Sequence, residues 1–187
     1  MRGSPDLRPT LWRTCRVLGN YQRLRIFGFL LAEPDQTVSN VAERCDLMLP
    51  AASQYLRLLE SRGLLKAHRV GRSVKYEVSS DDHPSLNAGL VQALRMVFEW
   101  KIMSIQTVFA LVTAFAHPRR IEIVRALRAG PATMDQLRAT TGISLRSLRR
   151  HLAKLERRRF IKHRDAHYVV IPPSNPFRRE LIRLTEV

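Results

Sequence analysis

Cysteine is scarce in this sequence, where Cys15 and Cys45 are the only two among 187 residues. Small secreted domains that depend on disulfides carry several cysteines, so this chain is expected to have no disulfide framework. No cleavable signal peptide precedes the first cysteine. These absences favour a reducing, cytoplasmic compartment and predict two buried structural cysteines.

Long hydrophobic runs are missing too. The most apolar stretch, residues 90–116, is interrupted by Arg95, Glu99 and Lys101, and its longest uncharged run is 102–117. A membrane-spanning helix needs about 20 apolar residues, so we expect no transmembrane span. Low-complexity tracts are absent and the hydrophobic content of 45% is ordinary, which predicts a folded chain.

Acidic residues are few relative to basic ones. The chain has 32 Lys plus Arg against 16 Asp plus Glu, which gives a formal net charge of +16. Such an excess indicates a polyanionic partner, most often nucleic acid and less often an anionic membrane surface. The charge is uneven, because residues 1–86 carry a net +4 and residues 87–187 a net +12.

Catalytic signatures are also missing. The sequence shows no nucleophile and base pair, no phosphate-binding glycine loop and no paired-carboxylate pattern. We therefore expect a protein that is not an enzyme, with no catalytic residue and no cofactor.

An internal duplication is present. Residues 17–78 align with residues 114–171, so that Leu24 falls on Ile121 at an offset of 97, and the offset becomes 96 after the next loop. Each change of offset lies where a loop or hairpin tip is expected. The pattern indicates a duplicated domain of roughly 65 residues.

Each copy is predicted to contain three helices followed by a hairpin. In the second copy, Thr133 is a candidate N-cap and Gly142 follows the end of the short second helix. The third helix, 144–159, places leucines on one face and basic residues on the other.

The hairpins complete the pattern. Residues 165–166 form a two-residue turn in the second copy, and the first copy has a longer tip at 70–73. A short helix, tight turn, amphipathic helix and hairpin together form a winged helix-turn-helix. The predicted fold is mostly α with small β-wings (α+β), in which two tandem winged helix-turn-helix domains, 1–83 and 107–187, are joined by a long apolar connecting helix at 84–106.

These motifs resemble those of ArsR-type winged-helix regulators. Residues 116–123, AHPRRIEI, are similar to the opening of that family, residues 49–56, LPAASQYL, to its recognition helix, and residues 71–76, GRSVKY, to its wing tip. The resemblance covers both copies. It implies a prokaryotic transcriptional regulator that binds double-stranded DNA sequence-specifically, as a repressor, through recognition helices at 49–62 and 144–159.

The resemblance also places the DNA-binding residues. In the second copy they are Arg146, Ser147, Arg149, Arg150, Lys154 and Arg157, with Lys162 and Arg164 on the wing. In the first copy they are Ser53, Gln54, Tyr55 and Arg57, with Arg72 and Lys75 on the wing. Arginine can bond a guanine edge and glutamine an adenine edge, while wing cations suit phosphates or the minor groove. The alternative is a solvated basic surface, which the unpaired like charges of the second copy disfavour.

Metal and thiol sensing are common in the family but are not expected here. At the two positions of the family's cysteine-pair site this chain has Glu43 and Cys45. One thiolate cannot hold a soft metal. Asp81 and His83 look like the start of a second family site, whose later ligand positions are apolar here. We expect no metal, and the sequence does not identify a small-molecule inducer.

Leucines and phenylalanines, Phe109 among them, repeat at helical spacing through residues 84–116, which predicts one long helix or two abutting helices. With the C-terminal helix at 177–184, this stripe is expected to form a seam, since the first and last helices of the family build its dimer interface. The seam joins either the two units of one chain as a pseudo-dimer or two chains as a homodimer. A ligand pocket is the less favoured alternative.

Two other functions stay open from the sequence. A plasmid or phage replication initiator also carries two winged helices, and it would bind iterated origin repeats rather than one operator. Alternatively, the first unit binds a partner protein while the second alone binds DNA.

Overall fold

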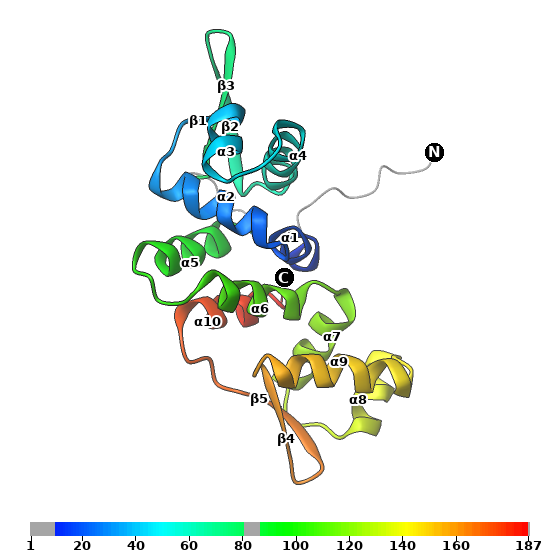
Figure 1. The fold of residues 1–187 in the computed structure, drawn as a ribbon. Coiled ribbons are helices and arrows are strands. Elements are labelled where there is room, and N and C mark those ends of the chain that lie inside the picture. The colour runs from blue at the N-terminus through cyan, green and yellow to red at the C-terminus, as the bar shows by residue number, and fades with distance from the viewer. Residues whose placement is uncertain (1–9, 81–86, 187) are drawn as a thin grey trace, which may run out of the picture.

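The computed structural model describes residues 10–80 and 87–186, a mostly helical chain with small antiparallel sheets (Figure 1). The first part contains α1 (Leu11–Leu18), α2 (Tyr21–Ala32), β1 (Gln36–Thr37), α3 (Val38–Arg44), α4 (Leu49–Glu60), β2 (Leu65–Val70) and β3 (Ser73–Val78). The second contains α5 (Ala88–Glu99), α6 (Ile105–Phe115), α7 (Pro118–Arg128), α8 (Met134–Thr141), α9 (Leu145–Arg157), β4 (Ile161–Arg164), β5 (His167–Val170) and α10 (Pro176–Arg183).

Capping residues fix the helix ends where the sequence predicts them. Thr133 and Gln136 form a reciprocal capping box at the start of α8, and Gly142 ends that helix with φ of 64°. Both assignments are confirmed. At the start of α7, the Nδ1 atom of His117 accepts a hydrogen bond from the backbone N–H of Arg119 at 3.2 Å.

The hairpins follow the expectation in one copy and depart from it in the other. In the second copy, Asp165 and Ala166 have φ of 48° and 64° and form the expected two-residue turn. The longer tip expected at 70–73 is wrong, because Val70 pairs with Ser73 and leaves a two-residue turn there as well. The first copy gains a short third strand, β1, which pairs with β3.

The segment between the copies is two helices, α5 and α6, separated by residues 100–104. Of the two alternatives predicted for residues 84–116, two abutting helices are confirmed, so a single connecting helix does not run across 100–104. Residues 84–86 lie outside the described part. Lys101, with φ of 48°, ends α5, and Ser104 begins α6 by accepting a hydrogen bond from the backbone N–H of Thr107 at 3.2 Å.

The order of elements repeats over a longer part of the chain than the sequence alignment covers. Helix α1 precedes α2 as α6 precedes α7, and in each pair an arginine closes the junction. Arg23 donates to the carbonyl of Val17 at the end of α1, and Arg120 donates to the carbonyls of Thr113 and Ala114 at the end of α6. The order of helices and hairpins in α1–α5 thus recurs in α6–α10.

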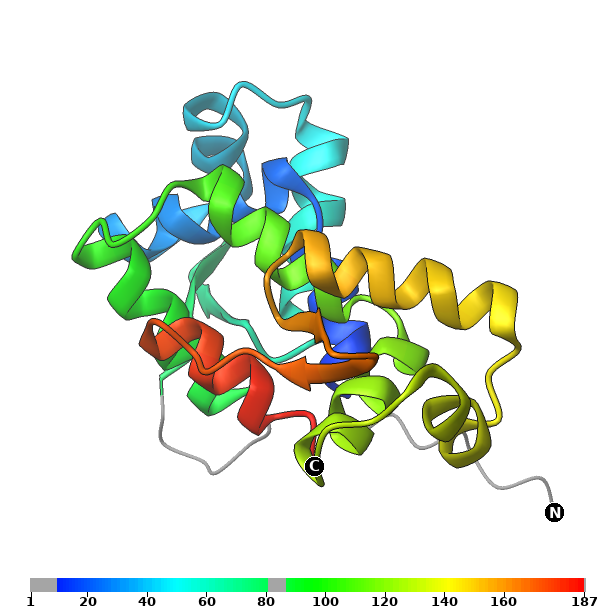
Figure 2. The same cartoon turned by 90° about the horizontal axis from the view of Figure 1, so that it is seen from below.

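Equivalent helices pack against each other at the centre of the molecule. Helix α1 lies against α6 and α5 against α10, in a layer between the two hairpin-bearing ends (Figures 1 and 2). Gly89 of α5 allows this approach, because a Cβ there would overlap the carboxylate of Glu180 on α10. The buried residues of both copies form one continuous hydrophobic core.

In the described part of the chain, no helix is long and apolar enough to cross a membrane.

The C-terminal ends of α4 and α9 offer a matched test of backbone strain. Gly63 and Arg159 hold the same left-handed position, with φ of 65° and 56°. Because this conformation disfavours a side chain, Arg159→Gly is expected to raise the free energy of unfolding by about 0.5–1 kcal/mol, measured by urea denaturation. Gly63→Ala should lower the free energy of unfolding by about 1 kcal/mol. If both variants change this free energy in the same direction, backbone strain at the left-handed position does not explain the effect.

Candidate nucleic-acid interface

Helix α9 is anchored by one face. Leu148, Leu152 and Leu155 are essentially fully buried, at 3.6-residue spacing, against the core that α7, α8 and β4 also build. His151 is buried on the same face, at 4% exposure, which the sequence analysis did not anticipate. This packing fixes which side of α9 faces outward.

The outward face carries the cations. Arg146, Arg149, Arg150 and Arg157 are exposed, whereas Ser147 and Lys154 are half-buried. The one acid of the helix, Glu156, turns to the hairpin, where its Oε1 atom accepts the backbone N–H of His163 at 3.2 Å. Within residues 10–80 and 87–186, none of these four arginines forms an ion pair.

The positive charge is dense enough to affect its neighbours. The pKa of Lys154 is lowered, chiefly by burial and then by the charges of Arg158, Arg120 and Arg157. Like charges this close together repel one another, and a bound polyanion would relieve that repulsion. Within residues 10–80 and 87–186 the four exposed arginines of α9 have no acidic partner, so its outer face is strongly positive.

The C-terminal end of α9 is held by α10. Arg178 donates hydrogen bonds to the carbonyls of Arg158 and Arg159 at 3.1 and 3.0 Å, and its guanidinium lies 4.9 Å from the ring centre of Phe160. These contacts satisfy carbonyls that have no partner within the helix. They fix the direction of α9 relative to the central helices.

The second hairpin adds two exposed cations. Lys162 and Arg164 lie on β4 two residues apart, so their side chains leave the same face of the strand. Arg164 contacts Asp165 at 3.4 Å, but both side chains are largely exposed, so the guanidinium remains accessible.

The first copy is less basic at the same place. On α4, Gln54 and Arg57 are exposed, and Ser53 is half-buried and accepts a hydrogen bond from Arg57 at 2.8 Å. The ring of Tyr55 is half-buried beneath the guanidinium of Arg23, at 5.5 Å. Tyr55 therefore faces the protein. Of the four DNA-binding residues expected on α4, Gln54 and Arg57 have exposed side chains.

The first hairpin projects from the end of the molecule opposite the second (Figure 1). Arg72 is exposed in its turn, and Lys75 is half-buried on β3. In Figure 1, helix α4 lies above the central helices and α9 lies below them.

An exposed apolar pair was missed by the sequence analysis. Met48 and Leu49, at the start of α4, are 77% and 52% exposed. Their signal is present in the sequence, because the polar positions that begin α9, Ser144 and Arg146, correspond to Met48 and Pro50 in the first copy.

The two cysteines have the burial that a structural role predicts. Cys15 and Cys45 are both free and buried, as expected. Glu43, at the position of the family's first cysteine ligand, is exposed. Among the described residues, no three His, Cys, Asp or Glu side chains gather as a metal site would require, and Asp81 and His83 lie outside those residues.

Two comparisons with known proteins bear on this site. Residues 112–186 match the family model described as the HVO_A0261 N-terminal domain. Over 144 residues, 74% of this chain, the sequence is 30% identical to the HTH-type transcriptional regulator Rv0324 of Mycobacterium tuberculosis. The chain covers 62% of that relative's length. It is therefore similar, over most of its length, to a regulator named for a helix-turn-helix.

Proposed function

We propose that this chain is a sequence-specific double-stranded DNA-binding transcriptional regulator, and that it acts as a repressor by occupying a promoter. It acts by binding rather than by catalysis. The observation that carries the proposal is the outer face of α9. Its exposed arginines have no ion pair within the described residues, and they lie opposite a stripe of buried leucines. The similarity to a helix-turn-helix regulator supports it.

Helices α8 and α9 have the dimensions of a helix-turn-helix. A short helix, a turn through Gly142 with left-handed backbone and a longer amphipathic helix are followed by the β4–β5 hairpin. In this arrangement the N-terminal half of the second helix enters the major groove. Arg146 and Arg150 would meet base edges, while Arg157, Lys162 and Arg164 would contact phosphates.

We further propose that the two copies are tandem winged helix-turn-helix units, of the ArsR type, that pair within one chain. An interface between two like units with twofold symmetry places equivalent elements against each other. The contacts of α1 with α6 and of α5 with α10 follow this rule. One chain would then present α4 and α9 together, as a dimer of single-unit chains presents two identical helices.

The experiment that tests the function is a binding titration. Purified protein selects its site from random or genomic duplexes, and fluorescence anisotropy then measures the affinity for that site and for a scrambled duplex at two salt concentrations. We expect specific binding at least about 1,000-fold tighter than non-specific binding, with strong salt dependence. Affinity that is equal for both duplexes would exclude sequence-specific regulation.

Single arginine substitutions should separate base reading from phosphate contact. Arg150→Ala is expected to weaken specific binding by about 1–3 kcal/mol and to relax the preference at one base pair. Arg157→Ala should weaken binding to all sequences alike and lower the salt dependence by about one phosphate contact.

Two further variants serve as references in the same titration. Lys101→Gln removes one charge from the loop between α5 and α6 and should leave DNA binding nearly unchanged, because that loop lies away from α9 in Figure 1. Gln54→Ala should cost less than Arg150→Ala, because a neutral hydrogen bond contributes less than a charge-assisted one. Equal losses for Gln54→Ala and Arg150→Ala would contradict the assignment of α9 as the main reader.

A second candidate function rests on the exposed Met48 and Leu49 at the start of α4. If these side chains contact a partner protein instead of DNA, the second unit alone binds the duplex. The protected site would then span one half-site, and the Met48→Ser/Leu49→Ser variant would bind DNA with wild-type affinity.

A further inference from the structure

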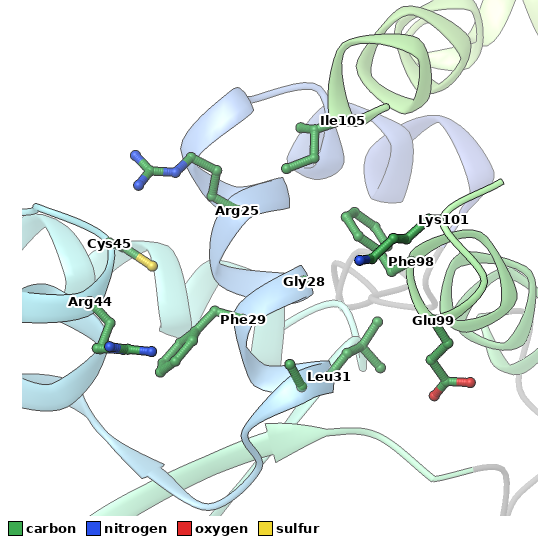
Figure 3. A pocket seen from close by; sticks show the side chains of 11 residues that line it. Arg25, Gly28, Phe29, Leu31, Arg44, Cys45, Phe98, Glu99, Lys101 and Ile105 are labelled. Carbon is green, nitrogen blue, oxygen red and sulfur yellow. The ribbon is translucent and has the colours of Figure 1, made fainter. Parts of the chain in front are cut away.

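A groove of about 570 Å³ crosses α2 in the first copy, with α3 on one side and the junction of α5 and α6 on the other. Figure 3 shows Arg44 and Cys45 on the α3 side, Phe98 and Lys101 on the opposite side, and Arg25, Gly28 and Phe29 along α2 between them. Pockets of this volume hold small organic molecules.

The walls of the groove are aromatic. Phe98 lies so close to α2 that a Cβ at position 28 would be 3.0 Å from its ring. A glycine within a helix costs about 1 kcal/mol relative to alanine, and at position 28 the missing side chain lets the ring of Phe98 lie on the helix. Phe29 forms the other aromatic surface, with the guanidinium of Arg44 5.7 Å from its ring centre.

The charge at the groove is positive and incompletely neutralised. Arg44 pairs with Glu33 at 2.9 Å, and Glu99, which points away from the other side chains in Figure 3, pairs with Arg95 at 3.5 Å. In the described part of the chain, Arg25 and Lys101 have no carboxylate partner. Arg25 bonds instead to the neutral amide of Gln22, at 2.9 Å.

Cys45 does not offset these cations. Burial raises the pKa of its thiol, against the smaller opposing effects of Arg25 and Arg44, so the sulfur is uncharged at neutral pH. The groove therefore combines two aromatic surfaces, a neutral sulfur and two cations that lack a counter-charge.

The second copy provides an internal comparison. The equivalent place holds a hollow of about 400 Å³, where Glu122, Arg125 and Ala126 stand in the positions of Arg25, Gly28 and Phe29. Glu122 pairs with Arg119 at 2.9 Å, and the lining contains no aromatic ring. The aromatic and cationic character is therefore specific to the first copy and is not a consequence of the repeated fold.

Lys101 occupies its position at a conformational cost. It has φ of 48° at the end of α5, where the backbone N–H of Ile102 donates to the carbonyl of Val97 at 3.1 Å. Glycine is the residue best suited to that conformation. A lysine there places its amino group at the groove, where Figure 3 shows it beside Phe98.

We propose that this groove binds a small organic anion with an aromatic body, such as an aromatic carboxylate or sulfonate. The ring packs on Phe98, and Lys101 meets the anionic group, while Phe29 and Arg25 line the groove on its α3 side. Because the ligand would contact α2 and α3 of the first unit and the α5–α6 junction together, it would link that unit to the central helices. The site does not depend on whether the chain binds DNA.

The test uses 8-anilinonaphthalene-1-sulfonate as the probe and the uncharged N-phenyl-1-naphthylamine as its matched analogue, in fluorescence titrations of the full chain at physiological salt. We expect one saturable sulfonate site per chain, with at least about tenfold weaker binding of the uncharged analogue. Sodium benzoate and sodium salicylate should displace the probe.

Three variants locate the site. Phe98→Ala and Lys101→Gly should each weaken probe binding about tenfold, and Lys101→Gly should melt at or above the wild-type temperature because glycine relieves the positive φ. Arg119→Gln, in the hollow of the second copy, should bind as wild type does. Probe binding that Lys101→Gly leaves intact, or equal affinity for the charged and uncharged probes, would overturn the proposal.

Discussion

Replacing Phe115 by alanine is expected to unfold both copies together at a lower temperature. Phe115 is fully buried at the end of α6, and its ring meets that of Phe160 edge-on, with 4.7 Å between the ring centres. Removing a buried phenylalanine costs about 3–5 kcal/mol, because the packing contacts are lost and a cavity remains. For a chain of this size, the melting temperature should fall by roughly 10 °C.

Because the hydrophobic core is continuous, we expect both copies to unfold in one thermal transition. Helix α6 packs against α1 and α2 of the first copy as well as α7 and α10, so a cavity at Phe115 weakens the centre that both copies share. Circular dichroism and differential scanning calorimetry should both report one transition. Two transitions, of which one keeps the wild-type temperature, would show that the copies fold independently.

Phe109 provides the matched comparison on the same helix. It was expected in the central seam, but the structure leaves it half-buried, whereas Phe115 is fully buried. Phe109→Ala should therefore lower the free energy of unfolding by about 1–2 kcal/mol, less than Phe115→Ala. A larger loss for Phe109→Ala would indicate that it is covered by a further chain in solution.

The faces of α9 could be predicted from sequence because one side of the helix is exposed. Leucines at helical spacing and arginines between them produce a clear period, and the structure buries Leu148, Leu152 and Leu155 as that period requires. The helices α5 and α6 lie at the centre of the molecule, so their apolar pattern is nearly continuous. That continuity left one long helix and two abutting helices both open, and the break at 100–104, where Trp100 is 75% exposed, decides between them.

Family resemblance was a weaker guide than helical period for individual side chains. Tyr55 was assigned to DNA by resemblance, yet it occupies the same position in α4 that the buried His151 occupies in α9. Position 151 lies three residues after Leu148, so helix geometry alone places it beside the leucine stripe. Strand β1 escaped prediction because two residues are too few to show a period.

Acid is expected to destabilise the second copy through His151. Burial lowers the pKa of His151 from 6.5 to about 4, and the neighbouring His117, Arg120, Arg150 and Arg119 add to the effect. The rings of His117 and His151 lie 4.6 Å apart. The pKa of His117 is lowered as well, by burial and by Arg120, Arg150 and Arg119, against an opposing effect of Glu122.

The direction of the pH effect follows from these pKa values. The unfolded chain takes up a proton near pH 6.5, whereas folded His151 resists it until about pH 4. The stability is complete above pH 6.5 and falls between about pH 6.5 and 4, by on the order of 2–3 kcal/mol. Protonation of His117 would also remove the acceptor that caps α7, which acts in the same direction.

Urea denaturation between pH 4 and 7.5 measures this effect. His151→Leu should lower the slope of stability against pH in that window, because a leucine at the buried position cannot take up a proton. Leu148→Val, a buried variant on the same helix, should cost about 1 kcal/mol equally at every pH and keep the wild-type slope. If His151→Leu retained that slope, the acid sensitivity of the chain would lie elsewhere, and the contact between His151 and His117 would have no role in titration.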